Sequence, residues 1–153
     1  MRHVSDLLTG EQRAGVIRTV RDSNPDMTEV MAGRIVDEAT KFVVAGARFP
    51  AVALAPSRVV DEGWHALIVH TRLYEELCEQ HGRFVHHSPG YDPTHYDPGI
   101  LERTRAVIEE AGYSVDDELW RGPQDGLVSV AANCQHAPTC AIRPMPKPEP
   151  PVT

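Results

Sequence analysis

The densest group of side chains that could do chemistry lies in the middle of the chain, where five of the eight histidines fall within 23 consecutive residues. Asp61 and His65 stand four residues apart, a spacing that places both on one face of an α-helix. His86 and His87 follow the predicted end of that helix, where a loop could bring them back toward the pair. A mixed carboxylate and imidazole set suits Zn²⁺ or another transition metal better than Ca²⁺ or Mg²⁺. The segment therefore predicts a divalent-metal site at Asp61, His65, His86 and His87.

The same segment also allows a purely structural interpretation. Asp61 could pair with Arg72 or accept a backbone N–H, and His65 could bond to a loop carbonyl. Trp64 and Cys78 fit a helix–helix core, Cys78 as a small buried apolar residue. In the metal interpretation, the side chains expected to line the pocket are Trp64, Arg72, Tyr74 and Cys78.

A second candidate cluster lies near the C-terminus, at Cys134, His136 and Cys140. These three could supply soft metal ligands, or the two cysteines could form a disulfide, since few residues separate them. A structural zinc site needs a fourth ligand, which the local sequence does not provide. A metal or redox role and an ordinary loop therefore both remain open for this cluster.

The elements that must position these residues are helices. Apolar periodicity predicts them over residues 9–22, 28–47, 57–80 and 98–111, with a short turn at 116–120. The expected N-caps are Thr9, Thr28 and Ser57. The predicted fold is all-α, a single small helical domain of about four helices over residues 1–121, followed by an irregular tail over residues 122–153.

The tail is rich in proline, with five of the thirteen prolines in the last ten residues. Proline removes a backbone donor and fixes φ, so this stretch is expected to be extended rather than helical. Residues 127–132 could form a short strand. Pro148 and Pro151 form a Pro-x-x-Pro pattern, which predicts that the tail could bind a protein partner through an aromatic groove.

Charge and composition exclude several classes of function. The formal net charge is −7, which argues against general binding to nucleic acid or to an anionic membrane. The sequence contains no apolar run of about 20 residues and no secretory signal pattern at its start, so a cytoplasmic location is expected. It also contains no phosphate-binding glycine loop, no Gly-x-Ser-x-Gly elbow and no Cys-x-x-Cys pair.

The central block reads Val60-Asp61, then Trp64-His65, Tyr74, Cys78 and Gly82, and ends on His87-Ser88-Pro89. This pattern resembles the characteristic block of the glycine-rich domain-containing protein-like family, over about 30 residues. The resemblance implies no established reaction. The long glycine-rich, cysteine-containing tail of many relatives is absent from this chain.

Three functions are compatible with these residues. The first is a small helical binding or accessory module that presents Asp61, His65 and His86 to a divalent metal or a small polar ligand. The second is a metal-dependent enzyme that uses the same residues. The third is a pure protein-interaction domain whose histidine cluster is structural. The sequence alone leaves open whether the protein is an enzyme.

Overall fold

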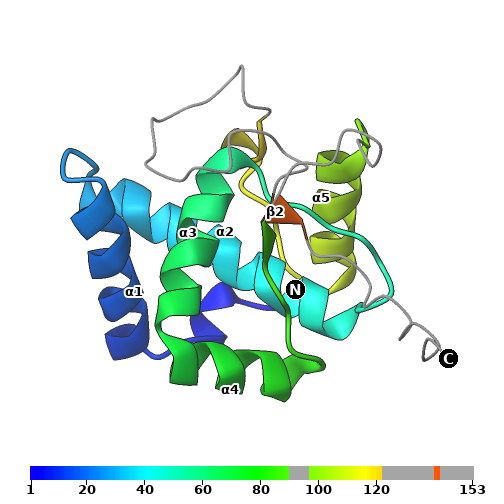
Figure 1. Ribbon diagram of the computed structural model, residues 1–153, viewed down its shortest axis with the longest axis horizontal. Coiled ribbons are helices and arrows are strands. Elements are labelled where there is room, and N and C mark those ends of the chain that lie inside the picture. Colours follow the sequence, from blue (N-terminus) through cyan, green and yellow to red (C-terminus); the bar gives the residue numbers. More distant parts are fainter. Residues whose placement is uncertain (90–96, 122–139, 142–153) are drawn as a thin grey trace, which may run out of the picture.

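The computed structural model describes residues 1–89, 97–121 and 140–141, and in these residues the chain is mainly helical, as predicted (Figure 1). Its elements are the 3-10 helix η1 (Val4–Asp6), α1 (Gly10–Ser23), α2 (Glu29–Arg48), α3 (Arg58–Val69), α4 (Thr71–His81), β1 (Ser88–Pro89), α5 (Ile100–Glu110), the 3-10 helix η3 (Asp117–Trp120) and β2 (Cys140–Ala141). The two short strands pair antiparallel, with Ser88 opposite Ala141 and Pro89 opposite Cys140.

Several predicted features lie outside the described residues. They are the 127–132 strand, the proline-rich tail from residue 143 onward, and Cys134 and His136 of the second cluster. Among the described helices, none is long and apolar enough to cross a lipid bilayer.

The first three long helices begin at the predicted caps. The Thr9 hydroxyl accepts the backbone N–H of Gln12, whose side chain accepts the N–H of Thr9 in return, which completes a capping box. Thr28 and Ser57 accept N–H groups in the same way at the starts of α2 and α3. Each such cap stabilises its helix by about 1 kcal/mol.

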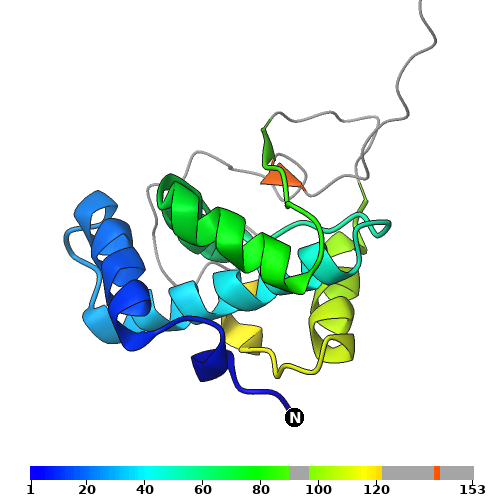
Figure 2. The same cartoon turned by 90° about the horizontal axis from the view of Figure 1, so that it is seen from below.

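Helix α2 forms the centre of the fold, and α1, α3, α4 and α5 all contact it (Figures 1 and 2). Every residue from Glu38 to Ala47 is buried, so the second half of this helix is enclosed on all sides. The Phe42 ring meets the Trp64 ring of α3 edge to face, with centroids 5.0 Å apart. The core therefore joins α2 directly to the helix that carries Asp61 and His65.

Helices α2 and α3 make a close backbone contact at Gly63. A Cβ atom at this position would lie 2.7 Å from the Ala39 Cβ and 2.8 Å from the Ile35 carbonyl oxygen. Only glycine allows the two backbones to come this near. The close contact determines how far α3 can approach the core, and hence the position of the candidate site.

The prediction of one continuous helix from residue 57 to 80 is wrong, because the chain turns sharply at His70 between α3 and α4 (Figure 1). The His70 N–H bonds to the Leu67 carbonyl, and the His70 carbonyl accepts the N–H of Tyr74, so α4 starts directly where α3 ends. The His70 Nε2 lies 2.8 Å from the Thr19 hydroxyl of α1. The turn lets α4 pack across α2, and it leaves Thr71 exposed.

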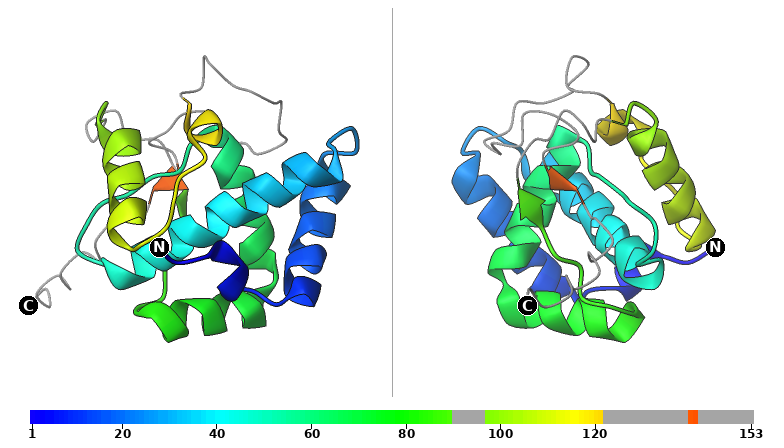
Figure 3. Two further views of the ribbon diagram at one scale, coloured as in Figure 1. Left: turned by 180° about the vertical axis from the view of Figure 1, so that it is seen from behind. Right: turned by 45° about the vertical axis from the view of Figure 1, so that its right-hand side comes forward.

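Helix α5 and η3 also pack against α2, and η3 contacts α3 as well (Figure 3). Buried Lys41 pairs with Glu38 and donates to the Ser114 carbonyl at 2.7 Å. The Trp120 indole donates to the other Glu38 oxygen at 2.9 Å. These charged groups are hydrogen-bonded inside the fold, which offsets the cost of burying them.

His81, the last residue of α4, makes stability depend on pH. Burial lowers its pKa, and the positive charges of Arg48 and Arg2 lower it further. As the pH falls through about 6.5, the unfolded chain therefore takes up this proton before the folded chain does, and stability is lost. We expect the free energy of unfolding of wild type to fall more steeply than that of His81→Gln between about pH 7 and pH 5. Urea titrations at each pH measure both slopes, and equal slopes would contradict this assignment.

Candidate metal centre

Two of the predicted ligands lie one helical turn apart on α3. Asp61 is almost fully buried, with 1% of its side chain exposed, whereas His65 is 34% exposed. The His65 Nε2 lies 3.4 Å from the Asp61 Oδ2. The i, i+4 spacing seen in the sequence therefore does bring the imidazole and the carboxylate together.

The third member of the cluster is His87, from the segment that follows α4. Its Nε2 lies 2.9 Å from the His65 Nε2 and 3.8 Å from the Asp61 Oδ1. One ligand atom from each of these three residues lies within 4.8 Å of the others. Asp61, His65 and His87 are called the triad below.

His86 lies outside the triad, in contrast to its predicted role. Its side chain is exposed, and its ring packs against the Phe84 ring with centroids 4.8 Å apart. Consecutive residues of an extended segment point to opposite sides. Since His87 faces α3, its neighbour faces away.

The Asp61 carboxylate is the least satisfied group of the triad. Both of its oxygens are buried, and neither has a hydrogen-bond partner among the described residues. A buried carboxylate without donors is costly unless a cation compensates it. The site thus has one buried negative charge and two imidazole nitrogens directed at the same small volume.

The separations within the triad fit a shared metal ion. Two atoms bound to a metal at about 2.05 Å stand about 2.9 Å apart at a right angle and about 3.4 Å apart at the tetrahedral angle. The observed 2.9 Å between the two imidazole nitrogens and 3.4 Å from His65 to the Asp61 Oδ2 match these values, whereas the 3.8 Å from His87 is measured to the other Asp61 oxygen, Oδ1, and is wider than both. The competing arrangement is one N–H···N hydrogen bond between the imidazoles, which leaves the Asp61 carboxylate without a donor among the residues that the structure describes.

The predicted pocket-lining residues divide into two groups. Trp64, Tyr74 and Cys78 are buried behind the triad, and the Trp64 ring contacts the His87 ring with centroids 4.6 Å apart. Burial raises the pKa of the Cys78 thiol, as expected for a buried apolar-like cysteine. Arg72 is exposed on α4. The predicted pairing of Arg72 with Asp61 is not formed, because both Asp61 oxygens are buried and have no hydrogen-bond partner among the described residues.

Glu62 is a second buried acid on α3, and the sequence analysis did not single it out. It is 5% exposed, and its Oε1 accepts a hydrogen bond from the Asn24 amide at 2.7 Å. The bond ties α3 to the end of α1 beside the triad. An acid within an apolar helix segment is the signal that could have singled it out.

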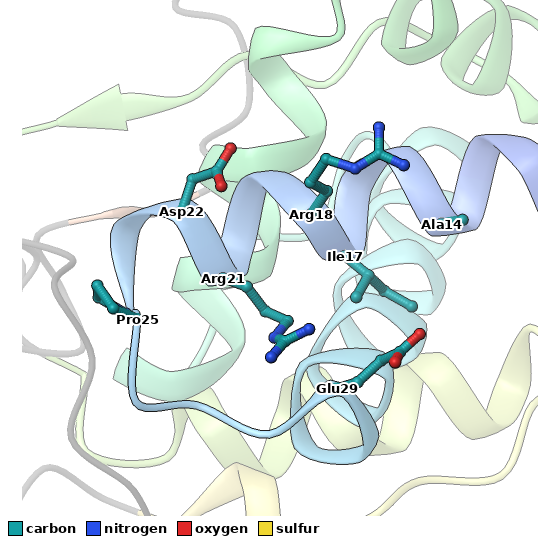
Figure 4. Close-up of a pocket in the computed structure, with 7 residues that line it drawn as sticks. All are labelled: Ala14, Ile17, Arg18, Arg21, Asp22, Pro25 and Glu29. Carbon is teal, nitrogen blue, oxygen red and sulfur yellow. The ribbon is translucent and has the colours of Figure 1, made fainter.

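The remaining candidates lie apart from the triad. Cys140 belongs to β2, and its two predicted partners lie outside the described residues. A hollow of about 350 Å³ lies along α1 and its turn into α2, with Arg18, Arg21, Asp22 and Glu29 around Ile17 (Figure 4). The four charged side chains are all exposed. This hollow is an open surface with mixed charge and contains no member of the triad.

Fold and site together define a small helical protein with a candidate His₂Asp metal centre. The profile of the UCP032817-like family matches residues 7–95, more than half of the chain, and the chain belongs to this family. The family is uncharacterised, and the match contradicts the resemblance to glycine-rich domain-containing proteins. That resemblance depended on a block of about 30 residues, whereas the profile spans α1 to α4 and the whole triad. No curated protein and no solved structure matches the chain.

Proposed function

We propose that the protein is a small helical module that binds one divalent transition-metal ion through Asp61, His65 and His87. The observation that carries this proposal is the Asp61 carboxylate, which is buried, has no hydrogen-bond donor in the part of the chain that the structure describes, and faces two imidazole nitrogens. A dication would compensate that charge and use both nitrogens as ligands. Of the four ligands expected from the sequence, the proposed set keeps Asp61, His65 and His87 and leaves out His86.

The ligand chemistry narrows the choice of metal. Two imidazoles and one carboxylate suit Zn²⁺, Fe²⁺, Co²⁺, Ni²⁺ or Cu²⁺, whereas Ca²⁺ and Mg²⁺ favour oxygen ligands. A set of three protein ligands is also typical of catalytic metal sites, which keep a position for water or substrate. The partly exposed His65 places the centre near the surface. A metal-dependent enzyme is therefore the second candidate function, and it uses the same residues.

Metal analysis of untagged protein tests the proposal. The protein is purified without chelator, under anaerobic conditions for Fe²⁺, and its metal content is measured by mass spectrometry. We expect about one transition-metal ion per chain after reconstitution and dialysis. Protein that retains no ion, and shows no saturable binding of Zn²⁺ or Co²⁺ in calorimetry, would leave a structural histidine cluster as the explanation.

Adjacent histidines supply a matched pair of variants. His87→Ala removes a triad nitrogen, whereas His86→Ala removes an exposed ring one residue away. We expect His87→Ala to weaken Co²⁺ binding roughly a hundredfold, because even partners of metal ligands contribute tenfold to a hundredfold. We expect His86→Ala to bind like wild type. Calorimetric titration of both variants measures the difference, and the reverse order of affinities would contradict the ligand assignment.

A further inference from the structure

The triad has one member that does not belong to α3. Asp61 and His65 are held at a constant spacing by one helix, so the geometry of the site depends on where the segment after α4 places His87. That segment begins at Gly82, which has a φ of +153° and lies so close to the Ala47 carbonyl that a Cβ atom would come within 2.0 Å of its oxygen. The Arg83 N–H then donates to the same carbonyl at 3.0 Å. These contacts anchor the start of the segment, four residues before His87.

A second anchor lies nearer to His87, at the Tyr74 hydroxyl. This oxygen accepts the Trp64 indole N–H at 3.0 Å and donates to the Val85 carbonyl. Trp64 is the residue before His65 on α3, and Val85 lies two residues before His87. The hydroxyl therefore connects the helix that carries two ligands to the segment that carries the third.

The bonding state of this hydroxyl is well defined. Tyr74 is buried, and burial raises the pKa of its phenol. The group therefore keeps its proton at neutral pH and remains a donor to the Val85 carbonyl. The Trp64 ring also contacts the His87 ring, so the same tryptophan touches both the hydroxyl and the ligand. Rotation of the His87 ring is restricted from that side.

We propose that Tyr74 is a positioning residue of the metal centre, whose hydroxyl sets the distance between His87 and the two ligands on α3. This inference rests on the proposed metal-binding function. Residues that contact the metal ligands without binding the ion orient those ligands. Their removal weakens metal binding by about tenfold to a hundredfold. Tyr74 does not touch the ion in this arrangement. It acts through the backbone at Val85.

The test compares Tyr74→Phe with wild type in titrations with Co²⁺, whose visible spectrum reports the ligand geometry. We expect Tyr74→Phe to bind Co²⁺ about tenfold more weakly and to show an altered visible spectrum. Thr104→Val is the matched control, because it also deletes a buried hydroxyl and leaves a buried N–H, that of Ala55, without its partner. Thr104 lies on α5, away from the triad, so this variant should keep wild-type affinity and spectrum.

The outcomes separate the two proposals. Equal affinity and an identical spectrum for Tyr74→Phe and wild type would overturn the positioning role and leave the metal site intact. Failure of wild type itself to bind Co²⁺ would overturn both. An equal loss of affinity in Thr104→Val would show a general effect of lost stability and would also overturn the positioning role.

A measurement on wild type covers the case in which Tyr74→Phe does not fold. If the Tyr74 bonds hold His87, then a metal that holds His87 must stabilise those bonds in return. We expect metal to slow hydrogen exchange of the Trp64 indole N–H several-fold more than that of Trp120, which bonds to Glu38. The chain has two tryptophans, so both signals are resolved by nitrogen-15 NMR. Equal slowing of the two would contradict the proposal.

Discussion

Asp61→Asn is expected to change metal binding and metal-free stability in opposite directions. The substitution keeps the side-chain shape but removes the buried charge, so Co²⁺ or Zn²⁺ affinity should fall by at least a hundredfold. In the metal-free protein it removes a carboxylate that has no donor among the described residues. We therefore expect the metal-free variant to unfold at the same temperature as wild type or about 3 °C higher, which corresponds to about 1 kcal/mol. Calorimetric titration and thermal unfolding with chelator measure the two effects.

Asp37→Asn is the control for this prediction. Asp37 is a half-buried acid of α2 that forms a bidentate ion pair with Arg13 at 2.8 and 3.1 Å. Removing its charge should lower stability slightly, by up to about 1 kcal/mol, and leave metal affinity unchanged. An Asp61→Asn protein that binds metal normally, or that loses stability without metal as Asp37→Asn does, would contradict the interpretation of Asp61 as an uncompensated ligand.

Among the substitutions considered, Gly63→Ala is expected to lower the free energy of unfolding the most. The new Cβ would clash with the Ala39 Cβ at 2.7 Å and with the Ile35 carbonyl oxygen at 2.8 Å. Neither neighbour is the end of a flexible side chain, so α3 must move away from α2. We expect a loss of about 3 kcal/mol, or roughly 10 °C in unfolding temperature. Urea unfolding of the metal-free protein measures it.

Gly10→Ala provides the matched comparison. It makes the same chemical change at the start of α1, where the new Cβ would meet no atom within 4 Å. Because alanine restricts the unfolded chain more than glycine, this variant should be neutral or more stable by about 0.5 kcal/mol. A similar effect for the two variants would show that close packing at Gly63 is not what the fold requires.

The helix bounds followed from local chemistry, but the turn between α3 and α4 did not. Caps at Thr9, Thr28 and Ser57 act within four residues, so their effect is visible in the sequence. At His70 there is no glycine or proline to mark a break. The chain turns there because α4 packs across α2 and buries Tyr74, Leu77 and Cys78. Tertiary burial of this kind overrides local helix propensity.

For the candidate site, the sequence alone determined the pair Asp61 and His65, because the period of the α-helix sets their separation whatever the rest of the chain does. Only the tertiary structure decided which loop histidine joins them. His86 and His87 are equivalent as ligands, and their order in the chain does not say which one faces α3. The choice follows from the contacts that hold the segment after α4, above all the Tyr74 hydroxyl on Val85. Those contacts join residues that are distant in sequence, and they exist only once the helices have packed.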